Sequence, residues 1–194
     1  MNVLMLGPMR PTLVSFIASQ GDNVRCTEGK IIAEGQLVEW ADFLVSYGYR
    51  HIIKPEVLRH FPRRAINLHI AYLPYNRGAD PNLWSFLEDT PKGVTIHFID
   101  RGLDTGDILV RREIPHRPED TLRTSYERLT DAIELLFMQA WPDIRAGKMT
   151  AVPQPEGGTS HKMSDREAFD SLLTMGWDTP VALLIGRALV AKED

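Results

Sequence analysis

Short apolar runs alternate with amphipathic stretches along most of the chain. Apolar runs bounded by turn-forming residues predict strands over residues 2–7, 23–27, 41–46, 64–69, 93–99 and 107–114. Apolar positions at helical spacing predict helices over residues 11–20, 55–60, 80–88 and 121–146. Because the strands alternate with helices, we expect an α/β fold built on a doubly wound, mostly parallel sheet.

The pattern changes after residue 150. Residues 152–158 are rich in proline and glycine, which predicts a segment that crosses the surface, and residues 159–163 predict a short extended piece. We therefore expect a main domain over residues 1–150 and a short, helical C-terminal extension over residues 151–194.

Two helices are predicted within this extension. Ser164 and Glu167 have the spacing of a capping box at a helix start, and Thr179-Pro180 predicts the start of a last helix. The apolar face of the last helix consists of Val181, Leu184, Ile185 and Leu189. This face either covers the sheet, which is the commoner arrangement, or pairs two subunits into a homodimer.

The composition is that of an ordinary globular protein. The 194 residues carry a formal net charge of −4, with 43% hydrophobic and 25% charged residues, so binding driven by a nucleic-acid backbone is not expected. A single cysteine, Cys26, excludes an intramolecular disulfide. Because no apolar run approaches ~20 residues and residues 1–7 are too short for a signal peptide, we expect no membrane partner and a cytoplasmic location.

Polar side chains stand at the ends of two predicted strands. Asn67 and His69 end one strand, His97 lies in another, and Asp104 follows in a glycine-rich turn. Since alternate residues of a strand share a face, Asn67 and His69 point the same way. Strand ends beside glycine turns are where α/β proteins place the groups that face a ligand.

Several familiar sites are not indicated. The first predicted strand is followed by Gly7-Pro8-Met9-Arg10 rather than by a glycine-rich dinucleotide turn. Histidine and cysteine pairs with zinc spacing are missing, and Asp100, Asp104 and Asp107 lack the pattern of a calcium loop. No Gly-x-Ser-x-Gly elbow occurs. We therefore expect neither a metal site nor a serine hydrolase.

The polar residues indicate a function more specifically as a set than one at a time. A histidine on a strand is usually a core or surface residue, and Asp104 could simply cap the turn between Gly102 and Gly106. Together, however, an amide can donate to an oxyanion, an imidazole can move a proton near neutral pH, and a carboxylate can orient the imidazole. These groups suffice for acyl transfer to an amine without a metal.

The same residues resemble those of a known family. Asn67-x-His69 is followed by Leu73-Pro74, by Arg77-Gly78 and by a run from Gly93 to Asp107 that reads GVTIHFIDRGLDTGD. This series resembles the folate-dependent formyltransferases, which include glycinamide ribonucleotide transformylase, methionyl-tRNA formyltransferase and the sugar N-formyltransferases. The resemblance covers roughly residues 1–165. It implies a Rossmann-like formyltransferase fold with the catalytic domain in residues 1–150.

Carried over to this sequence, the resemblance implies that Asn67, His69 and Asp104 form a catalytic triad. It implies that 10-formyltetrahydrofolate is the formyl donor and that an amine attacks the formyl carbon. Asn67 and His69 would then stabilise the oxyanion while Asp104 orients His69. The implied folate site is built largely from backbone near two loops, which contain Arg50, His51, Ile52, Ile53, Asp100, Arg101 and Gly102. His97 is either a supporting strand residue or a substrate contact.

The acceptor is inferred from the surrounding motifs. Gly7-Pro8-Met9-Arg10 departs from the phosphate-holding turn of glycinamide ribonucleotide enzymes, and 194 residues would leave no room for the added basic domain of methionyl-tRNA enzymes. The stretch from Leu73 to Asn82 resembles the sugar N-formyltransferases. Pro153-Gln154-Pro155 resembles them too, and equally the methionyl-tRNA enzymes. We therefore expect a small-molecule amine, preferably on a nucleotide-linked amino sugar, with Arg10 or Arg77 donating to its diphosphate.

Three alternatives stay open. The acceptor could be another amine, such as a purine precursor. The chain could instead be a hydrolase that releases formate from the folate, with water in place of the amine. It could also be a folate-binding protein without turnover, although a binding protein does not need the triad.

Overall fold

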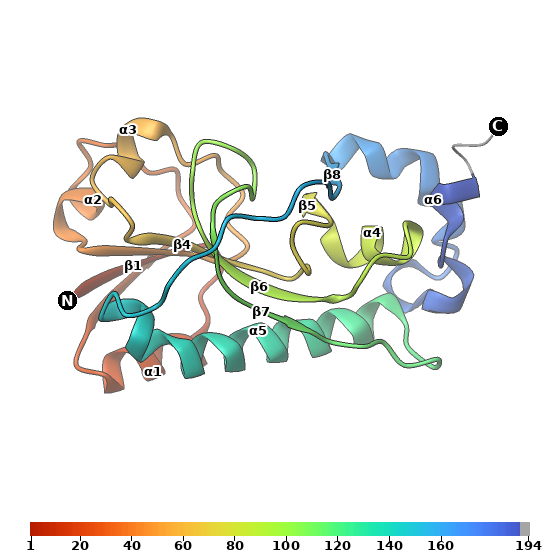
Figure 1. Cartoon of the computed structure of the whole chain (residues 1–194), viewed down its shortest axis with the longest axis horizontal. Helices are drawn as coiled ribbons and strands as arrows, with labels where there is room; N and C mark the ends of the chain where they lie inside the picture. The colour runs from red at the N-terminus through yellow and green to blue at the C-terminus, as the bar shows by residue number, and fades with distance from the viewer. Residues whose placement is uncertain (191–194) are drawn as a thin grey trace. The chain divides into compact units, whose positions relative to one another are not determined.

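The computed structural model describes residues 1–190, which contain a six-stranded sheet and a two-stranded sheet. The larger sheet has the strand order β2-β1-β3-β4-β6-β7 and consists of β1 (Asn2–Leu6), β2 (Asn23–Thr27), β3 (Phe43–Ser46), β4 (Ala65–His69), β6 (Gly93–Phe98) and β7 (Ile108–Glu113). Strands β1 to β4 pair in parallel. The hydrogen bonds from Phe98 N to Asp107 O and from Ile114 N to Lys92 O, both 2.9 Å, make β6 and β7 antiparallel. The predicted α/β class with a mostly parallel sheet is confirmed (Figure 1).

The helices follow the predicted pattern up to residue 150. They are α1 (Pro11–Ser19), α2 (Gln36–Trp40), α3 (Pro55–Leu58), α4 (Pro81–Leu87) and α5 (Leu122–Arg145). After residue 150 follows α6 (Arg187–Val190). Every strand and helix predicted before residue 150 is present, with small shifts at the ends. The short helix α2 and the parallel pairing of β5 (Arg77–Gly78) with β8 (Ser160–His161) were not predicted.

Contacts between Cα atoms divide the chain into two compact units. Unit 1 contains residues 1–69, 96–110 and 134–153, and unit 2 contains residues 70–95, 111–133 and 154–194. The division at residue 150 expected from the sequence stays a prediction. Within residues 1–190, no helix combines the length and the apolar character needed to cross a bilayer.

The core of unit 1 forms where residues of β1, β3 and β4 meet the helices and loops that follow β2 and β3. Leu4 of β1 and Leu44 of β3 are fully buried, and burial contributes about 1.5–3 kcal/mol for each such side chain. These residues pack with Ile31, Ala33, Val38, Val57, Phe61 and Ala65. At another point of unit 1, Trp141 of α5 packs edge-to-face on Phe43 at 5.1 Å and donates a hydrogen bond to the buried carboxylate of Asp22.

The core of unit 2 explains where the C-terminal extension packs. Its buried members are Leu83, Trp84, Phe86, Leu87, Leu122, Val181, Leu184 and Ala188. Two of the four apolar residues predicted to share a helix face, Val181 and Leu184, are fully buried in this core, while Ile185 and Leu189 are exposed. The buried half of this face packs against α4 and Leu122 of α5 rather than against the sheet, where one of the two expectations placed it. The pairing of two subunits stays a prediction.

The C-terminal helices differ from the prediction in two ways. A 3₁₀ helix spans Met163–Leu172, and Asp165 accepts a hydrogen bond from the backbone N of its N-cap, Lys162, at 2.8 Å. The predicted capping box between Ser164 and Glu167 is therefore wrong. The predicted last helix is also wrong, because it splits into a 3₁₀ turn (Val181–Leu183) and α6 at Gly186, whose φ of 74° ends helical geometry.

Candidate active site

Two of the predicted site residues lie at the end of β4. In the parallel pairing of β3 with β4, Ser46 is the partner of Asn67. Asn67 is half-buried, and His69, two residues further, is 7% exposed. Because β4 sits in the interior of the strand order, its backbone is fixed on both sides and the directions of both side chains are set by the sheet.

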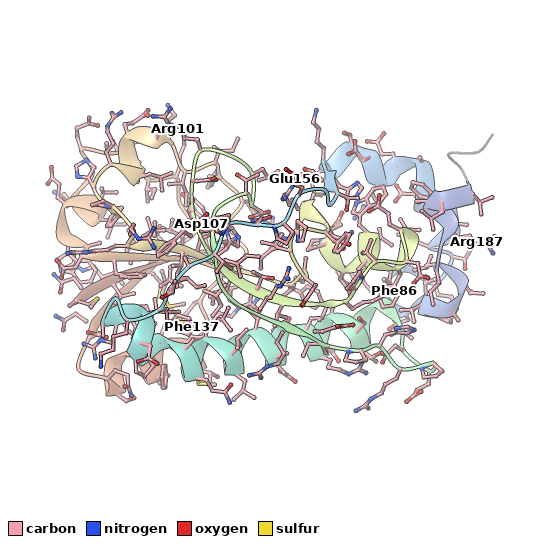
Figure 2. The ribbon with its side chains drawn as sticks, viewed as in Figure 1. Phe86, Arg101, Asp107, Phe137, Glu156 and Arg187 are labelled. Carbon is pink, nitrogen blue, oxygen red and sulfur yellow. The ribbon has the colours of Figure 1, made fainter. Side chains whose placement is uncertain are left out.

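The third residue, Asp104, is held by a locked turn between β6 and β7. Asp100 Oδ1 accepts hydrogen bonds from Gly102 N at 3.0 Å and from Thr105 Oγ1 at 2.7 Å. Asp104 itself has a φ of 53°, in the left-handed region that aspartate tolerates better than most residues. A Cβ on Gly106 would lie 1.9 Å from Phe98 O, so the turn needs glycine there. Figure 2 shows Asp107 where the turn rejoins the sheet.

The turn brings Asp104 back to the end of β4. Asn67 Nδ2 donates a hydrogen bond to Asp104 Oδ1 at 3.0 Å. His69 Nδ1 lies 3.8 Å from Asp104 Oδ2, which is an ion-pair distance if the imidazole is protonated. All three predicted catalytic residues therefore meet in unit 1. The carboxylate is nearer to the amide than to the imidazole, although the resemblance implied that it orients the imidazole.

His97 is the buried member of this cluster. It is 1% exposed, and its Nδ1 lies 2.8 Å from Phe98 O, which in a neutral ring requires the proton on Nδ1. Its Nε2 is then an acceptor for Asn67 Nδ2, 3.4 Å away, and lies 3.5 Å from Asp104 Oδ1. Such burial favours the supporting role over a substrate contact, two interpretations that the sequence left open.

Residues in or next to the two loops predicted to hold folate pack against the same cluster of the unit 1 core. Ile53 from one loop and Ile99 from the other pack against one cluster that includes Ala65. Ile52 and Leu103 are 85% and 55% exposed, so each loop presents an apolar side chain to solvent.

A cavity of about 200 Å³ lies beside the second loop. Its lining residues are Phe61, Arg63, Ala65, Phe98, Ile99, Asp100, Gly106 and Asp107. Of the residues predicted to bind folate, only Asp100 lines it. Arg50 and His51 on the first loop, and Arg101 and Gly102 on the second, are exposed.

Tyr49 fixes the start of the first loop. Its phenol donates a hydrogen bond to Gly29 O at 2.8 Å and accepts one from Ile31 N at 3.2 Å. Burial raises the pKa of the Tyr49 phenol, and the hydrogen bond from Ile31 opposes this rise. The His51 ring packs edge-to-face on Tyr49 at 5.2 Å. The loop is therefore anchored at Tyr49 while its tip is open to solvent.

The two predicted phosphate arginines differ in their surroundings. The Arg10 guanidinium lies over the Tyr47 ring at 4.6 Å and its Nη1 is 3.8 Å from a carboxylate oxygen of Glu134. Arg77, in unit 2, donates from Nε and Nη2 to Gln154 Oε1 at 3.0 and 2.9 Å. The sequence singles out Gln154 only as part of Pro153-Gln154-Pro155, and no spacing in the sequence pairs it with Arg77.

Comparison with protein families and curated sequences gives a consistent result. The family model described as formyl transferase matches residues 11–140. The methionyl-tRNA formyltransferase of Listeria monocytogenes serotype 4a is 38% identical over 129 residues, which cover 66% of this chain and 41% of that protein. The chain thus spans less than half the length of the curated relatives it matches.

Two solved structures are similar over more of the chain. The formyltransferase PseJ from Anoxybacillus kamchatkensis, in complex with UDP-4,6-dideoxy-4-formamido-L-AltNAc and tetrahydrofolate, is 56% identical with a TM-score of 0.95. That match covers 97% of this chain and 100% of the PseJ chain. Rv3404c from Mycobacterium tuberculosis, described as a likely sugar N-formyltransferase, is 25% identical with a TM-score of 0.74 and covers 86% of this chain and 77% of its own.

Proposed function

The chain belongs to the formyl transferase family, and we propose that it transfers a formyl group from 10-formyltetrahydrofolate to the amine of a nucleotide-linked amino sugar. The observation that carries the proposal is the cluster of Asn67, His69 and Asp104 in a chain that is 56% identical to PseJ over nearly its whole length. PseJ binds tetrahydrofolate and a UDP-linked formamido sugar.

The loops near the cluster fit a flat, partly apolar donor. Ile52 and Leu103 are apolar side chains exposed to solvent, which is unfavourable. A bound heterocycle would remove them from water. Ile99 and Asp100 supply an apolar wall and a carboxylate beside the same cavity. We assign the donor to these two loops, with Arg50, His51, Ile53, Arg101 and Gly102 as further contacts.

The cluster supplies the groups that formyl transfer needs. As the amine attacks the formyl carbon, a C–N bond forms and negative charge moves to the formyl oxygen. Hydrogen-bond donors placed where this charge develops accelerate such reactions. Asn67 Nδ2 and a protonated His69 are donors of this kind, although Asn67 must exchange its bond to Asp104 or His97 for one to the oxygen.

Proton movement is assigned to Asp104 and His69. The attacking amine must lose a proton, and the nitrogen of the departing folate must gain one. A carboxylate 3.8 Å from an imidazole can accept the first proton while the imidazolium delivers the second, and catalytic contacts often shorten when substrate binds. His97 would act only through its contacts with Asn67 and Asp104.

The acceptor proposal rests on a comparison rather than on the triad. An amino sugar linked to a nucleoside diphosphate is the substrate class that fits the UDP-linked formamido sugar bound by PseJ. Arg10 or Arg77 is the arginine that we assign to its phosphates. A cytoplasmic location and a small-molecule acceptor are parts of the same proposal. A second candidate is a methionyl-tRNA acceptor, because the curated relatives are methionyl-tRNA formyltransferases.

An acceptor screen tests these assignments. The chain is incubated with 10-formyltetrahydrofolate and, separately, with UDP-linked amino sugars, glycinamide ribonucleotide, methionyl-tRNA or no amine. The N-formylated acceptor (the formamide product), formate and tetrahydrofolate are then quantified. The proposal expects formamide on a nucleotide-linked amino sugar and little formate without an amine. Formate release at full rate without any amine would instead identify a hydrolase.

A further inference from the structure

Gln154 and Arg77 form a two-donor, one-acceptor contact within unit 2. Arg77 Nε and Nη2 both donate to Gln154 Oε1, at 3.0 and 2.9 Å, and both side chains are half-buried. This contact uses the side edge of the guanidinium. Of its five N–H groups, two on Nη1 and one on Nη2 remain. One N–H from each of Nη1 and Nη2 forms the end edge, which matches two phosphate oxygens.

The positive charge of Arg77 is left uncompensated by this contact. Gln154 offers a neutral carbonyl, and Arg77 forms no ion pair with a carboxylate among residues 1–190. Arg10, by contrast, faces Glu134, and Arg166 of unit 2 lies 3.4 Å from Asp80. A half-buried arginine held by a neutral partner attracts an anionic ligand more strongly than one already paired with a carboxylate.

The backbone on both sides of this contact is fixed. Arg77 N donates to Thr159 O at 3.0 Å, and Asn76 N donates to Thr159 Oγ1 at 2.9 Å. Asn76 is fully buried, and its Oδ1 accepts a hydrogen bond from Thr90 at 2.8 Å. Gly158 packs directly on the Pro74 carbonyl. The position of the guanidinium is therefore set before any ligand binds, which reduces the entropic cost of binding.

We propose that Gln154 is a positioning residue that holds Arg77, without neutralising it, as the binding group for the diphosphate of the acceptor. This inference rests on the proposed function and sharpens it, since it selects Arg77 over Arg10 and adds a residue from the C-terminal segment. Specificity for a charged nucleotide over a free amino sugar then follows from one oriented guanidinium.

The substitution Gln154→Glu tests the proposal. Glutamate has nearly the same shape and still accepts both hydrogen bonds, but its charge neutralises Arg77 and repels phosphate. Isothermal titration with UDP should show an affinity at least about tenfold lower than that of the wild-type chain. Uridine, which lacks phosphate, should bind both proteins equally. Gln154→Ala, which frees Arg77 without adding charge, should weaken UDP binding by a smaller factor.

Two controls keep the outcomes distinct. Gln36→Glu adds the same charge at an exposed residue of α2 in unit 1 and should leave UDP binding unchanged. Formamide production by the wild-type chain tests the proposed function by itself. If the wild-type chain formylates an amino sugar but Gln154→Glu binds UDP normally, the role of Gln154 is wrong and the function stands. Equal losses of UDP and uridine affinity would also overturn the role, because they would indicate disrupted structure rather than lost phosphate binding.

Discussion

Asn67 Nδ2 donates a hydrogen bond to Asp104 Oδ1 at 3.0 Å, across a separation of 37 residues in the sequence. The contact joins the end of a parallel strand to a turn whose backbone is left-handed at the aspartate. The carboxylate therefore fixes the amide first. Its effect on His69, 3.8 Å away, depends on the protonation of the imidazole.

Replacing Asp104 with asparagine should nearly abolish turnover. Asparagine keeps the size and tolerates the left-handed backbone, so the change removes mainly the charge. We expect kcat to fall by about 10²–10⁴ while the Kd for tetrahydrofolate changes less than about threefold. Steady-state kinetics and titration measure the two. Asp89→Asn is the matched control, since Asp89 also has a positive φ of 47° but lies in unit 2; a similar loss there would contradict the assignment.

His97 should act through Asn67 rather than on substrate. Replacing it with phenylalanine keeps a ring in the buried site but removes the acceptor near Asn67 Nδ2. We expect a loss in kcat of about tenfold or more, with the KM for the acceptor little changed. In a double-mutant cycle, Asn67→Ala combined with His97→Phe should lose hardly more than Asn67→Ala alone. Additive losses would show that His97 has a separate role.

The stability of the chain should depend on Asp120 at acidic pH. Burial opposes the charge of the Asp120 carboxyl, but hydrogen bonds from Arg128, Arg117 N and Thr124 outweigh it and lower its pKa from 3.8 to about 2. Because the folded-state pKa is depressed, the carboxylate stabilises the fold above about pH 4, and this contribution is lost as pH falls toward 2. At neutral pH it amounts to roughly 2 kcal/mol.

Denaturant unfolding at pH 7 and at pH 2.5 measures this contribution. Asp120→Asn should be less stable than the wild-type chain at pH 7, and the difference should shrink at pH 2.5. The side chain is 2% exposed and sits 2.5 Å from Arg128 Nη2, so salt should screen the pair only weakly. A stability difference that is equal at both pH values would rule out this linkage.

Two adjacent glycines offer a test of the segment that carries Gln154. Gly157 and Gly158 have the same φ of 84°. A Cβ on Gly158 would lie 2.1 Å from Pro74 O, whereas no atom of residues 1–190 lies within 4 Å of one on Gly157. Alanine at either position bears the backbone strain, and only Gly158→Ala adds the clash. We expect Gly158→Ala to lower the free energy of unfolding by about 1–3 kcal/mol more than Gly157→Ala. Equal thermal shifts would mean that the contact with Pro74 is not formed.

Strand and helix positions were predictable because each local pattern agrees with the fold. The apolar run before Asn67 and the glycine-bounded run that contains His97 specify strands without further information. The exceptions have physical causes: β5 and β8 are each two residues long, and their pairing joins segments about eighty positions apart. Neither strand has enough residues to show a period.

The sequence predicts which residues form the site but not how they are arranged in it. The motif placed Asn67, His69 and Asp104 together, since their spacing in sequence carries the resemblance. It did not indicate that Asp104 approaches Asn67 more closely than His69, because that depends on the φ of 53° at Asp104 and on the turn bonded by Asp100. The contact between Arg77 and Gln154 could not be predicted either, because it depends on how the segment that carries Gln154 passes the segment that carries Arg77.

The most direct test of the central claim is a mass balance on one reaction. The chain is mixed with 10-formyltetrahydrofolate and a UDP-linked 4-amino sugar, and formamide, formate and tetrahydrofolate are followed by mass spectrometry. Formyl transfer predicts one formamide for each tetrahydrofolate released, almost no formate, and loss of both products in Asp104→Asn. Release of tetrahydrofolate with an equal amount of formate, unaffected by the amine, would contradict the account.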